Sequence, residues 1–333
     1  MKAPPPTAYP VSIAPMMQRT DRHYRYLMRR ITRHTLLYTE MLTTGAIIHG
    51  DRQRLLGFHD DEHPLVLQIG GSDPDELAEA ARIGQSFGYD EINLNVGCPS
   101  SRVQNARIGA CLMESPEVVA RAVEAMRQAV DVEVTVKHRI GVDEVDSYDH
   151  MLDFVDTVAD AGCRRFIVHA RKAWLQGLSP AENRNVPPLR HHEIHRLKDE
   201  RPELIIETNG GIDSYDEIDA HLEYVDGVMI GRAAYDDPWL FSEVDRRYFG
   251  DDHPIPTRHE VVEGLFDYVR YWTEERGARL HHISRHLLQI FRAQPGARAW
   301  RRHISNNACD RDAGVDVLRE GLDLISEINS PAA

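Results

Sequence analysis

The sequence has few cysteines, few lysines and no long apolar run. Four cysteines are spread over 333 residues, at Cys98, Cys111, Cys163 and Cys309. Their spacing is neither that of metal ligands nor that of a dense disulfide framework, so we expect no metal and reduced thiols in a cytoplasm. No segment approaches the ~18 apolar residues of a membrane helix, and we expect no membrane association. The start, MKAPPPTAYP, lacks a signal-peptide core and predicts a flexible tail over residues 1–10.

Positive charge is concentrated in two arginine-rich segments. The net charge of −14 argues by itself against nucleic-acid binding, and lysine occurs only at positions 2, 137, 172 and 198. Residues 19–33, however, contain six arginines, and residues 281–311 contain six more together with four histidines. Two interpretations remain open for these segments, a phosphate-binding surface or solvated helix faces.

Strand-like and helix-like segments alternate through the first 245 residues. The helix-like segments include residues 73–88 and 115–130, in which Asp73-Pro74 and Ser115-Pro116 predict an N-cap followed by proline. The alternation favours a (β/α)8 TIM barrel over an open doubly wound sheet, which usually has fewer strands. The eight predicted strands are residues 11–14, 36–40, 65–70, 91–96, 132–138, 165–170, 204–209 and 226–231.

Strand signals end near residue 250. The segments 259–277, 281–294 and 313–328 have helical spacing, and the proline-containing segment 251–258 is typical of a linker. We therefore expect a catalytic barrel over residues 11–245 and a small all-helical domain over residues 251–333.

Polar residues and glycines stand where the predicted strands end. Active sites of this barrel form at the carboxyl ends of the strands, and phosphate sites often follow strands seven and eight. Gly210-Gly211 and Gly231-Arg232 occupy those two positions, so we predict a phosphate site there rather than a plain tight turn. Lys137 near the same mouth makes flavin mononucleotide (FMN) one candidate ligand, since a lysine can tune a flavin electrostatically.

Cys98 lies between Gly97 and Pro99, directly after the strand at 91–96. From the residues alone, a buried turn thiol and a functional thiol are equally acceptable, because free cysteine is commonly buried. Cys111 falls in the following helical turn, and we interpret it as a packing residue.

Several longer motifs resemble the tRNA-dihydrouridine synthase family. The resemblance extends from Val11 to about Asn306, and the GLSPAENR and PGARAWRRHIS elements resemble the A branch, which acts on D-loop uridines 20 and 20a of tRNA. It is carried by APMMQRTD (14–21), TEM (39–41), LQIGG (67–71), INLNVGCPSSRVQNARIGACLM (92–113), VTVKHRIG (134–141), VHARKAWLQGLSPAENR (168–184), NGGI (209–212), DGVMIGRAAYDDP (226–238) and PGARAWRRHIS (295–305).

The resemblance implies that NADPH reduces FMN and that reduced FMN passes hydride to C6 of the target uracil. Cys98 would then protonate C5, where negative charge develops, and a thiol is mostly protonated at physiological pH. Asn95 would contact the flipped-out uridine, and Arg184, Arg298 and Arg301 would contact tRNA. The implied FMN-binding residues are Pro15, Met16, Met17, Gln68, Lys137, His169, Asn209, Gly210, Gly211, Gly231 and Arg232.

Three other functions remain as alternatives. A flavin-dependent reductase of a free pyrimidine, such as a dihydroorotate-type barrel, would not need the arginine-rich helical domain. A tRNA-binding or folding factor would not need Cys98, Lys137 and His169. A flavin-free phosphate-binding barrel would leave the motif around Cys98 unexplained. We expect no obligate protein partner.

Overall fold

The computed structural model describes residues 9–100 and 107–329 of the chain. The predicted tail over residues 1–10 therefore lies almost wholly outside the described residues. The chain divides into two compact units. The first contains the residues up to Gln18 and those from Thr35 to Gly231, and the second contains Arg19–His34 and the residues from Arg232 onward.

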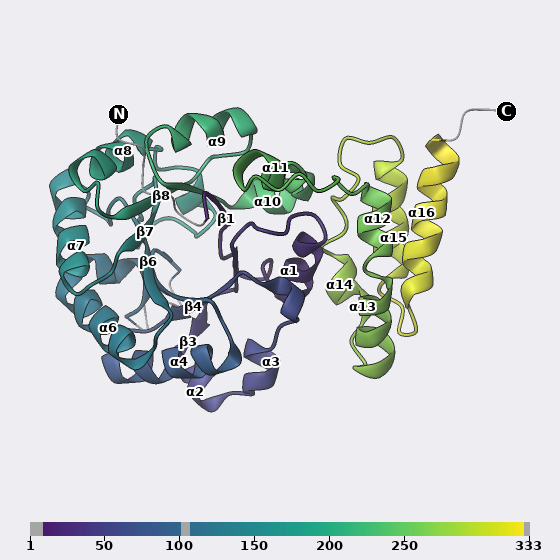
Figure 1. Cartoon of the computed structure of the whole chain (residues 1–333). Helices are drawn as coiled ribbons and strands as arrows, with labels where there is room; N and C mark the ends of the chain where they lie inside the picture. Colours follow the sequence, from purple (N-terminus) through teal and green to yellow (C-terminus); the bar gives the residue numbers. More distant parts are fainter. Residues whose placement is uncertain (1–8, 101–106, 330–333) are drawn as a thin grey trace. The chain divides into compact units, whose positions relative to one another are not determined.

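The first unit is built on a ring of parallel strands (Figure 1). Neighbours follow the order β1-β9-β8-β7-β6-β5-β4-β2, with β3 as an additional partner of β4. Hydrogen bonds from the Ile13 N–H to the Leu36 carbonyl (2.9 Å) and from the Leu36 N–H to the Val11 carbonyl (3.3 Å) close the ring. The strands are β1 (Val11–Ile13), β2 (Leu37–Tyr38), β3 (Leu42–Thr43), β4 (Leu65–Gly70), β5 (Glu91–Val96), β6 (Glu133–Arg139), β7 (Arg165–His169), β8 (Ile205–Asn209) and β9 (Gly227–Ile230).

Helices connect these strands and lie outside them. They are α2 (Thr44–His49), α3 (Arg52–Leu56), α4 (Pro74–Phe87), α6 (Pro116–Ala129), α7 (Tyr148–Asp160), α8 (His191–Glu200) and α9 (Tyr215–Leu222), with 3-10 turns at Asp60–Glu62, Gly109–Glu114 and Glu182–Arg184. The Asp73 side chain caps α4 as predicted, accepting from the Asp75 and Glu76 N–H groups. Ser115 is the N-cap residue of α6 and Pro116 follows it, as predicted, but the Ser115 side chain accepts no capping hydrogen bond. The (β/α)8 TIM barrel is confirmed.

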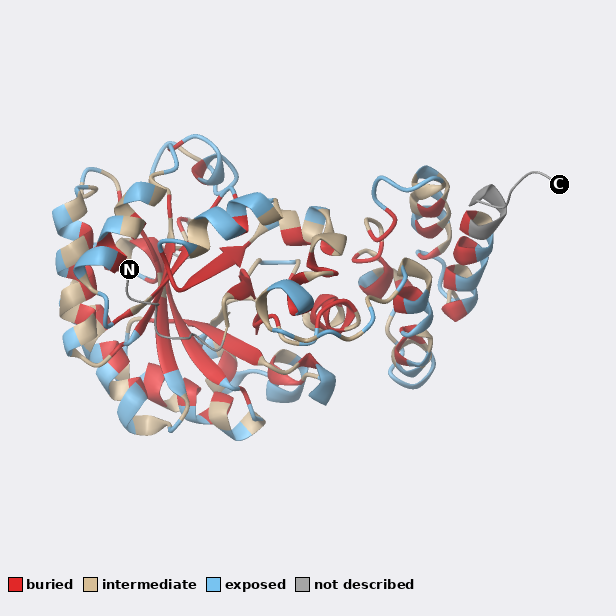
Figure 2. Ribbon diagram, turned by 45° about the horizontal axis from the view of Figure 1, so that its top comes forward, coloured by how far each residue is buried: buried red, intermediate tan, exposed pale blue. Residues whose placement is uncertain are grey.

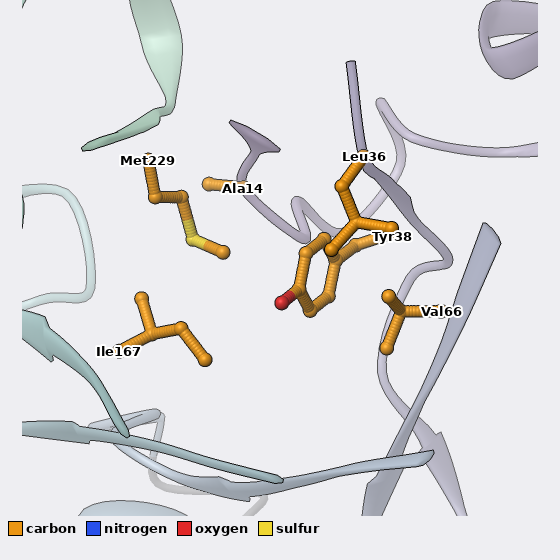
Figure 3. Close-up of a cluster of buried hydrophobic side chains, with 6 residues drawn as sticks. All are labelled: Ala14, Leu36, Tyr38, Val66, Ile167 and Met229. Atoms are coloured by element: carbon orange, nitrogen blue, oxygen red, sulfur yellow. The ribbon is translucent and has the colours of Figure 1, made fainter. Parts of the chain in front are cut away.

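The barrel interior has an apolar and a charged part. Strands β4 and β5 are buried along their whole length, and the barrel strands are mostly red in Figure 2. Alternate side chains of such strands face inward. Figure 3 shows six inward residues from five strands and their ends that pack together: Ala14, Leu36, Tyr38, Val66, Ile167 and Met229. Beside them, buried Arg165 donates to Glu91 at 2.9 Å and to Glu207 at 2.5 Å. This pairing satisfies a charge that would otherwise be costly to bury.

The second unit is helical. Its helices are α1 (Arg22–Arg29), α10 (Arg232–Asp236), α11 (Val244–Tyr248), α12 (Arg258–Glu263), α13 (Phe266–Arg270), α14 (Leu280–Ser284), α15 (Ala297–Asn307) and α16 (Val315–Asn329), with a 3-10 turn at Pro238–Phe241 and a π-helical turn at Tyr271–Glu275. The helical C-terminal region is confirmed, but two predicted helices were too long. The segment 259–277 is divided among α12, α13 and the π-helical turn, and the segment 281–294 is helical only to Ser284.

Helix α1 belongs to this helical unit although it follows the first barrel strand. The ring of Tyr26 stacks on Tyr268 with centroids 3.9 Å apart, and His23 Nδ1 hydrogen-bonds the Tyr268 hydroxyl at 2.9 Å. At the start of α1, Asp21 caps the helix and pairs with Arg285. The compact units thus separate at Gly231, and the division into domains at residues 245 and 251 stays a prediction. Among the described helices, none has the length and apolar content needed to cross a membrane.

Candidate active site

Five predicted polar residues come together inside the carboxyl-terminal end of the barrel. Asn95 pairs with Lys137 across β5 and β6, and His169 pairs with Asn209 across β7 and β8. Gln68 of β4 reaches the same layer, where its Oε1 accepts from Asn95 Nδ2 at 2.7 Å. These five side chains therefore lie together at one end of the barrel, as the sequence predicted, because alternate residues of parallel strands face the same mouth.

The backbone before Cys98 is held by the side chain of Asn95. Its Oδ1 accepts from the Gly97 N–H at 3.1 Å and from the Cys98 N–H at 3.0 Å. Because Nδ2 is engaged with Gln68, Asn95 has one N–H left for another molecule. The predicted contact between Asn95 and uridine stays a prediction, and a second role in orienting Cys98 is added to it.

Arg139 holds the other side of the same peptide segment. Its Nε donates to the Gly97 carbonyl at 2.8 Å, while its guanidinium also donates to the Lys172 and Asn183 carbonyls at 3.1 and 3.2 Å. Burial lowers the pKa of Arg139 to about 10, so the group stays charged at neutral pH. We did not predict this role, although Arg139 shares the inward face of β6 with Lys137, two residues earlier, and that spacing was the available signal.

Lys137 is a partly buried amine without an anionic partner among the described residues. Its Nζ donates to Asn209 Oδ1 at 3.1 Å, and Asn209 is itself fixed by its own donation to the Met229 carbonyl at 2.7 Å. Within the described part of the chain, Lys137 forms no ion pair with a carboxylate. Burial, followed by the charge of Arg139, lowers the pKa of Lys137 to about 7. The site therefore favours a negatively charged or electron-rich ligand beside Nζ.

His169 is neutral at physiological pH. Burial, followed by the charges of Arg139 and Lys137, lowers its pKa well below the ordinary value. Its Nδ1 accepts from the Arg171 N–H at 3.3 Å, so Nε2 carries the ring proton and can donate a hydrogen bond.

The turn after β8 requires both of its glycines. Gly210 and Gly211 have φ values of +119° and +78°, which other residues rarely adopt. A Cβ on Gly211 would lie 2.6 Å from Leu189 Cδ1, and one on Gly210 would lie 3.3 Å from His169 Nε2. At Gly231, after β9, the nearest atom would be Ala14 Cβ at 3.8 Å, so the backbone there is open to a ligand.

The other predicted FMN-binding residues lie at strand or helix ends. Pro15, Met16 and Met17 follow β1, and the Met17 side chain is 59% exposed. Arg232 is exposed and begins α10 in the helical unit.

The predicted tRNA-binding arginines are Arg298 and Arg301 in the helical unit and Arg184 in the barrel unit. Arg298, Arg301 and Arg302 line a depression of about 540 Å³ at the start of α15, and among the described residues none of them forms an ion pair. In the barrel unit, Arg184 ends the 3-10 turn after β7 and is exposed.

The first arginine-rich segment is different, because its side chains are used within the helical unit. Arg25 and Arg29 are buried and donate to backbone carbonyls, and Arg22 lies over the Trp272 ring. Arg19 and Arg33 pair with Asp236 and Asp251. These contacts favour a packing role for the arginines of residues 19–33.

The rest of the cysteine motif is only partly described. Residues 101–106 lie outside the described residues. Cys111 falls in the 3-10 turn Gly109–Glu114, as predicted, and its thiol donates to the Ile108 carbonyl at 3.3 Å. In the described ranges, no three His, Cys, Asp or Glu side chains gather as ligands of a metal ion.

Known proteins are similar to this chain over nearly its full length. The family model described as dihydrouridine synthase (Dus) matches residues 12–326. Proteins named tRNA-dihydrouridine(20/20a) synthase are similar to it. The one from Synechocystis sp. is 56% identical over 94% of this chain and 93% of its own length, and the one from Vibrio parahaemolyticus is 53% identical over 94% and 95%. The one from Escherichia coli is 50% identical over 96% of both chains. This chain belongs to the dihydrouridine synthase family.

Proposed function

We propose that this protein is an oxidoreductase that converts uridines 20 and 20a in the D-loop of tRNA to 5,6-dihydrouridine, with FMN as cofactor and NADPH as reductant. The observation that carries this proposal is the arrangement of Cys98. Asn95 and Arg139 hold the backbone beside this thiol, at the mouth that also contains Lys137 and His169. The names of the relatives agree with it.

The residues at the mouth fit FMN on two grounds. Lys137 has no anionic partner in the described structure, and the N–H of Gly211, in the turn after β8, has no acceptor there. Both features suit a ligand with a phosphate and an electron-rich ring edge. We assign FMN binding to Pro15, Met16, Met17, Gln68, Lys137, His169, Asn209, Gly210, Gly211, Gly231 and Arg232. FMN would supply the hydride that adds to C6 of the uracil.

The protein itself would supply the proton. Cys98 carries an S–H group on a backbone fixed from both sides, and C5 of the uracil is the atom at which negative charge develops. Donation from Sγ to C5 completes the reduction of the C5–C6 bond and leaves a thiolate, which solvent reprotonates before the next turnover. The remaining N–H of Asn95 would donate to the base and help to hold it out of the RNA stack.

Binding of tRNA would depend on Arg184, Arg298 and Arg301. Arg298 and Arg301 form no ion pair among the described residues, Arg184 is exposed, and arginine binds phosphate through its planar fork. We place the reaction in the cytoplasm, where the separate thiols Cys98, Cys111, Cys163 and Cys309 would stay reduced.

The test is a reaction with purified protein, FMN, NADPH and unmodified tRNA transcript, followed by mapping of dihydrouridine. We expect yellow protein and dihydrouridine at positions 20 and 20a. Free uridine and orotate, offered separately, address the alternative reductase of a free pyrimidine. Reduction of a free pyrimidine with no reaction on tRNA would refute the proposal, and a protein that does not bind added FMN would refute the cofactor assignment.

A further inference from the structure

His191 is bound through both ring nitrogens to the strand and turn that end in Gly210. It is the first residue of α8, and it has no part in the chemistry proposed above. Its Nδ1 lies 2.8 Å from Thr208 Oγ1, and its Nε2 lies 2.8 Å from the Gly210 carbonyl oxygen. A carbonyl oxygen can only accept, so Nε2 must carry the proton, and Nδ1 of the neutral ring accepts from the Thr208 hydroxyl.

This contact determines the direction of a neighbouring N–H group. The Gly210 carbonyl and the Gly211 N–H belong to one planar trans peptide, in which they point in opposite directions. Because His191 holds the carbonyl, the Gly211 N–H points away from the His191 ring. Within residues 9–100 and 107–329 this N–H has no acceptor. The turn itself gives little rigidity, since glycine is conformationally permissive.

The ring of His191 is supported by neighbouring aromatic groups. The ring of His221, from α9, lies 4.2 Å from it between centroids, and His195 Nε2 lies 3.1 Å from His221 Nδ1. Tyr224 stacks on His195 at 4.5 Å. Burial, followed by the charge of His221, lowers the pKa of His191 to about 4, so the same tautomer persists at physiological pH.

We propose that His191 is a positioning residue that orients the Gly210-Gly211 peptide so that the Gly211 N–H donates to the phosphate of the flavin cofactor. The inference rests on the proposed function, because it takes FMN as the ligand of this turn. The proposal predicts that the His191 ring affects the binding of FMN and riboflavin differently. His191 favours flavin that carries a phosphate and leaves recognition of the flavin ring unchanged.

The test compares the dissociation constants of FMN and riboflavin for apoprotein, measured by quenching of flavin fluorescence. His191→Phe retains a ring but removes both hydrogen bonds, and we expect FMN to bind about tenfold more weakly while riboflavin changes by less than about twofold. Thr208→Val removes only the hydroxyl that donates to His191 Nδ1. It should raise the dissociation constant of FMN by about threefold and leave that of riboflavin unchanged. The double variant should be no weaker than His191→Phe, because both substitutions break one chain of bonds.

His192→Phe is the matched control. It makes the same substitution at the next residue of α8, where the side chain is exposed, and should leave both constants unchanged. If His191→Phe lowers the affinity for FMN and for riboflavin equally, or lowers neither affinity, the inference is overturned. If circular dichroism shows that His191→Phe is unfolded, the Thr208→Val comparison decides by the same criterion. Wild-type apoprotein that binds neither flavin would instead overturn the proposed function, and that result differs from all of the others.

Discussion

The lowered pKa of Lys137 predicts that FMN binding weakens as pH rises above 7. In the free protein the amine has a pKa of about 7, because it is buried beside Arg139. An anionic or electron-rich ligand at Nζ favours the charged form and raises the pKa in the complex. Binding then takes up a proton between these two pKa values, and a reaction that takes up a proton becomes less favourable with increasing pH.

The size of the effect follows from the protonated fraction of Lys137. Between pH 7.0 and 8.5, the protonated fraction of an amine with a pKa of about 7 falls from about one half to about 3%. If Lys137 stays protonated in the complex, the dissociation constant of FMN should rise about 16-fold over this range. The range lies above the second ionisation of a phosphate, near pH ~6, so the ligand contributes little to the slope.

The stability of the free protein should depend on pH in the opposite direction: the contribution of Lys137 to stability should rise with pH, whereas FMN affinity falls. In the unfolded chain Lys137 has its ordinary pKa of 10.5. Between pH 7 and 10.5 the unfolded state therefore binds a proton that the folded state does not, and the contribution of this group to stability rises with pH. The melting temperature of apoprotein, taken as the difference between wild type and Lys137→Met, isolates this contribution from other titrating groups.

Fluorescence titration of FMN at intervals from pH 7.0 to 8.5 is the direct assay. Lys137→Met should bind FMN weakly and with no slope over this range. Lys172→Met is the matched control, since Lys172 pairs with Asp146 at 3.0 Å and should retain the wild-type slope. A wild-type dissociation constant that does not change with pH would refute the reasoning, as would an undiminished slope in Lys137→Met.

Three further predictions concern the thiol, its support and the RNA contacts. Cys98→Ala should lower dihydrouridine formation on tRNA by at least about 100-fold while NADPH still reduces bound FMN at close to the wild-type rate; unchanged turnover would mean that another group is the acid. Arg139→Met removes the hydrogen bond to the Gly97 carbonyl and should lower kcat by about tenfold or more with little change in KM for tRNA, and a change confined to KM would contradict a role in orienting the thiol. Arg298→Ala combined with Arg301→Ala should weaken tRNA binding and reduce the slope of log Kd against log salt by up to about two, with FMN affinity unchanged; an unaltered slope would make these arginines ordinary surface residues.

Much of the barrel was predictable because its signals are local. Each strand candidate has β-branched or aliphatic residues bounded by turn residues, and all eight lie within about two residues of an observed strand. The helical region was harder. The segment 259–277 has one apolar stripe, but its backbone changes to a π-helical turn at Tyr271–Glu275. Tyr268 of α13 and Trp272 of this turn pack with His23 of α1. A contact with a residue 245 positions earlier in the chain cannot be predicted from the local spacing of apolar residues.

The sequence by itself determined which residues face the barrel mouth. Once strands of parallel type are recognised, the two-residue period and the strand ends place Gln68, Asn95, Lys137, His169 and Asn209 together, and the structure has them there. Only tertiary structure decided which groups are already engaged. Arg139 of β6 reaches Gly97 at the end of the neighbouring strand β5. The arginines of residues 19–33 are used in contacts within the helical unit, whereas Arg298 and Arg301 form no ion pair among the described residues. The physical reason is that a side chain's partners depend on register and packing between distant segments, which composition and spacing do not contain.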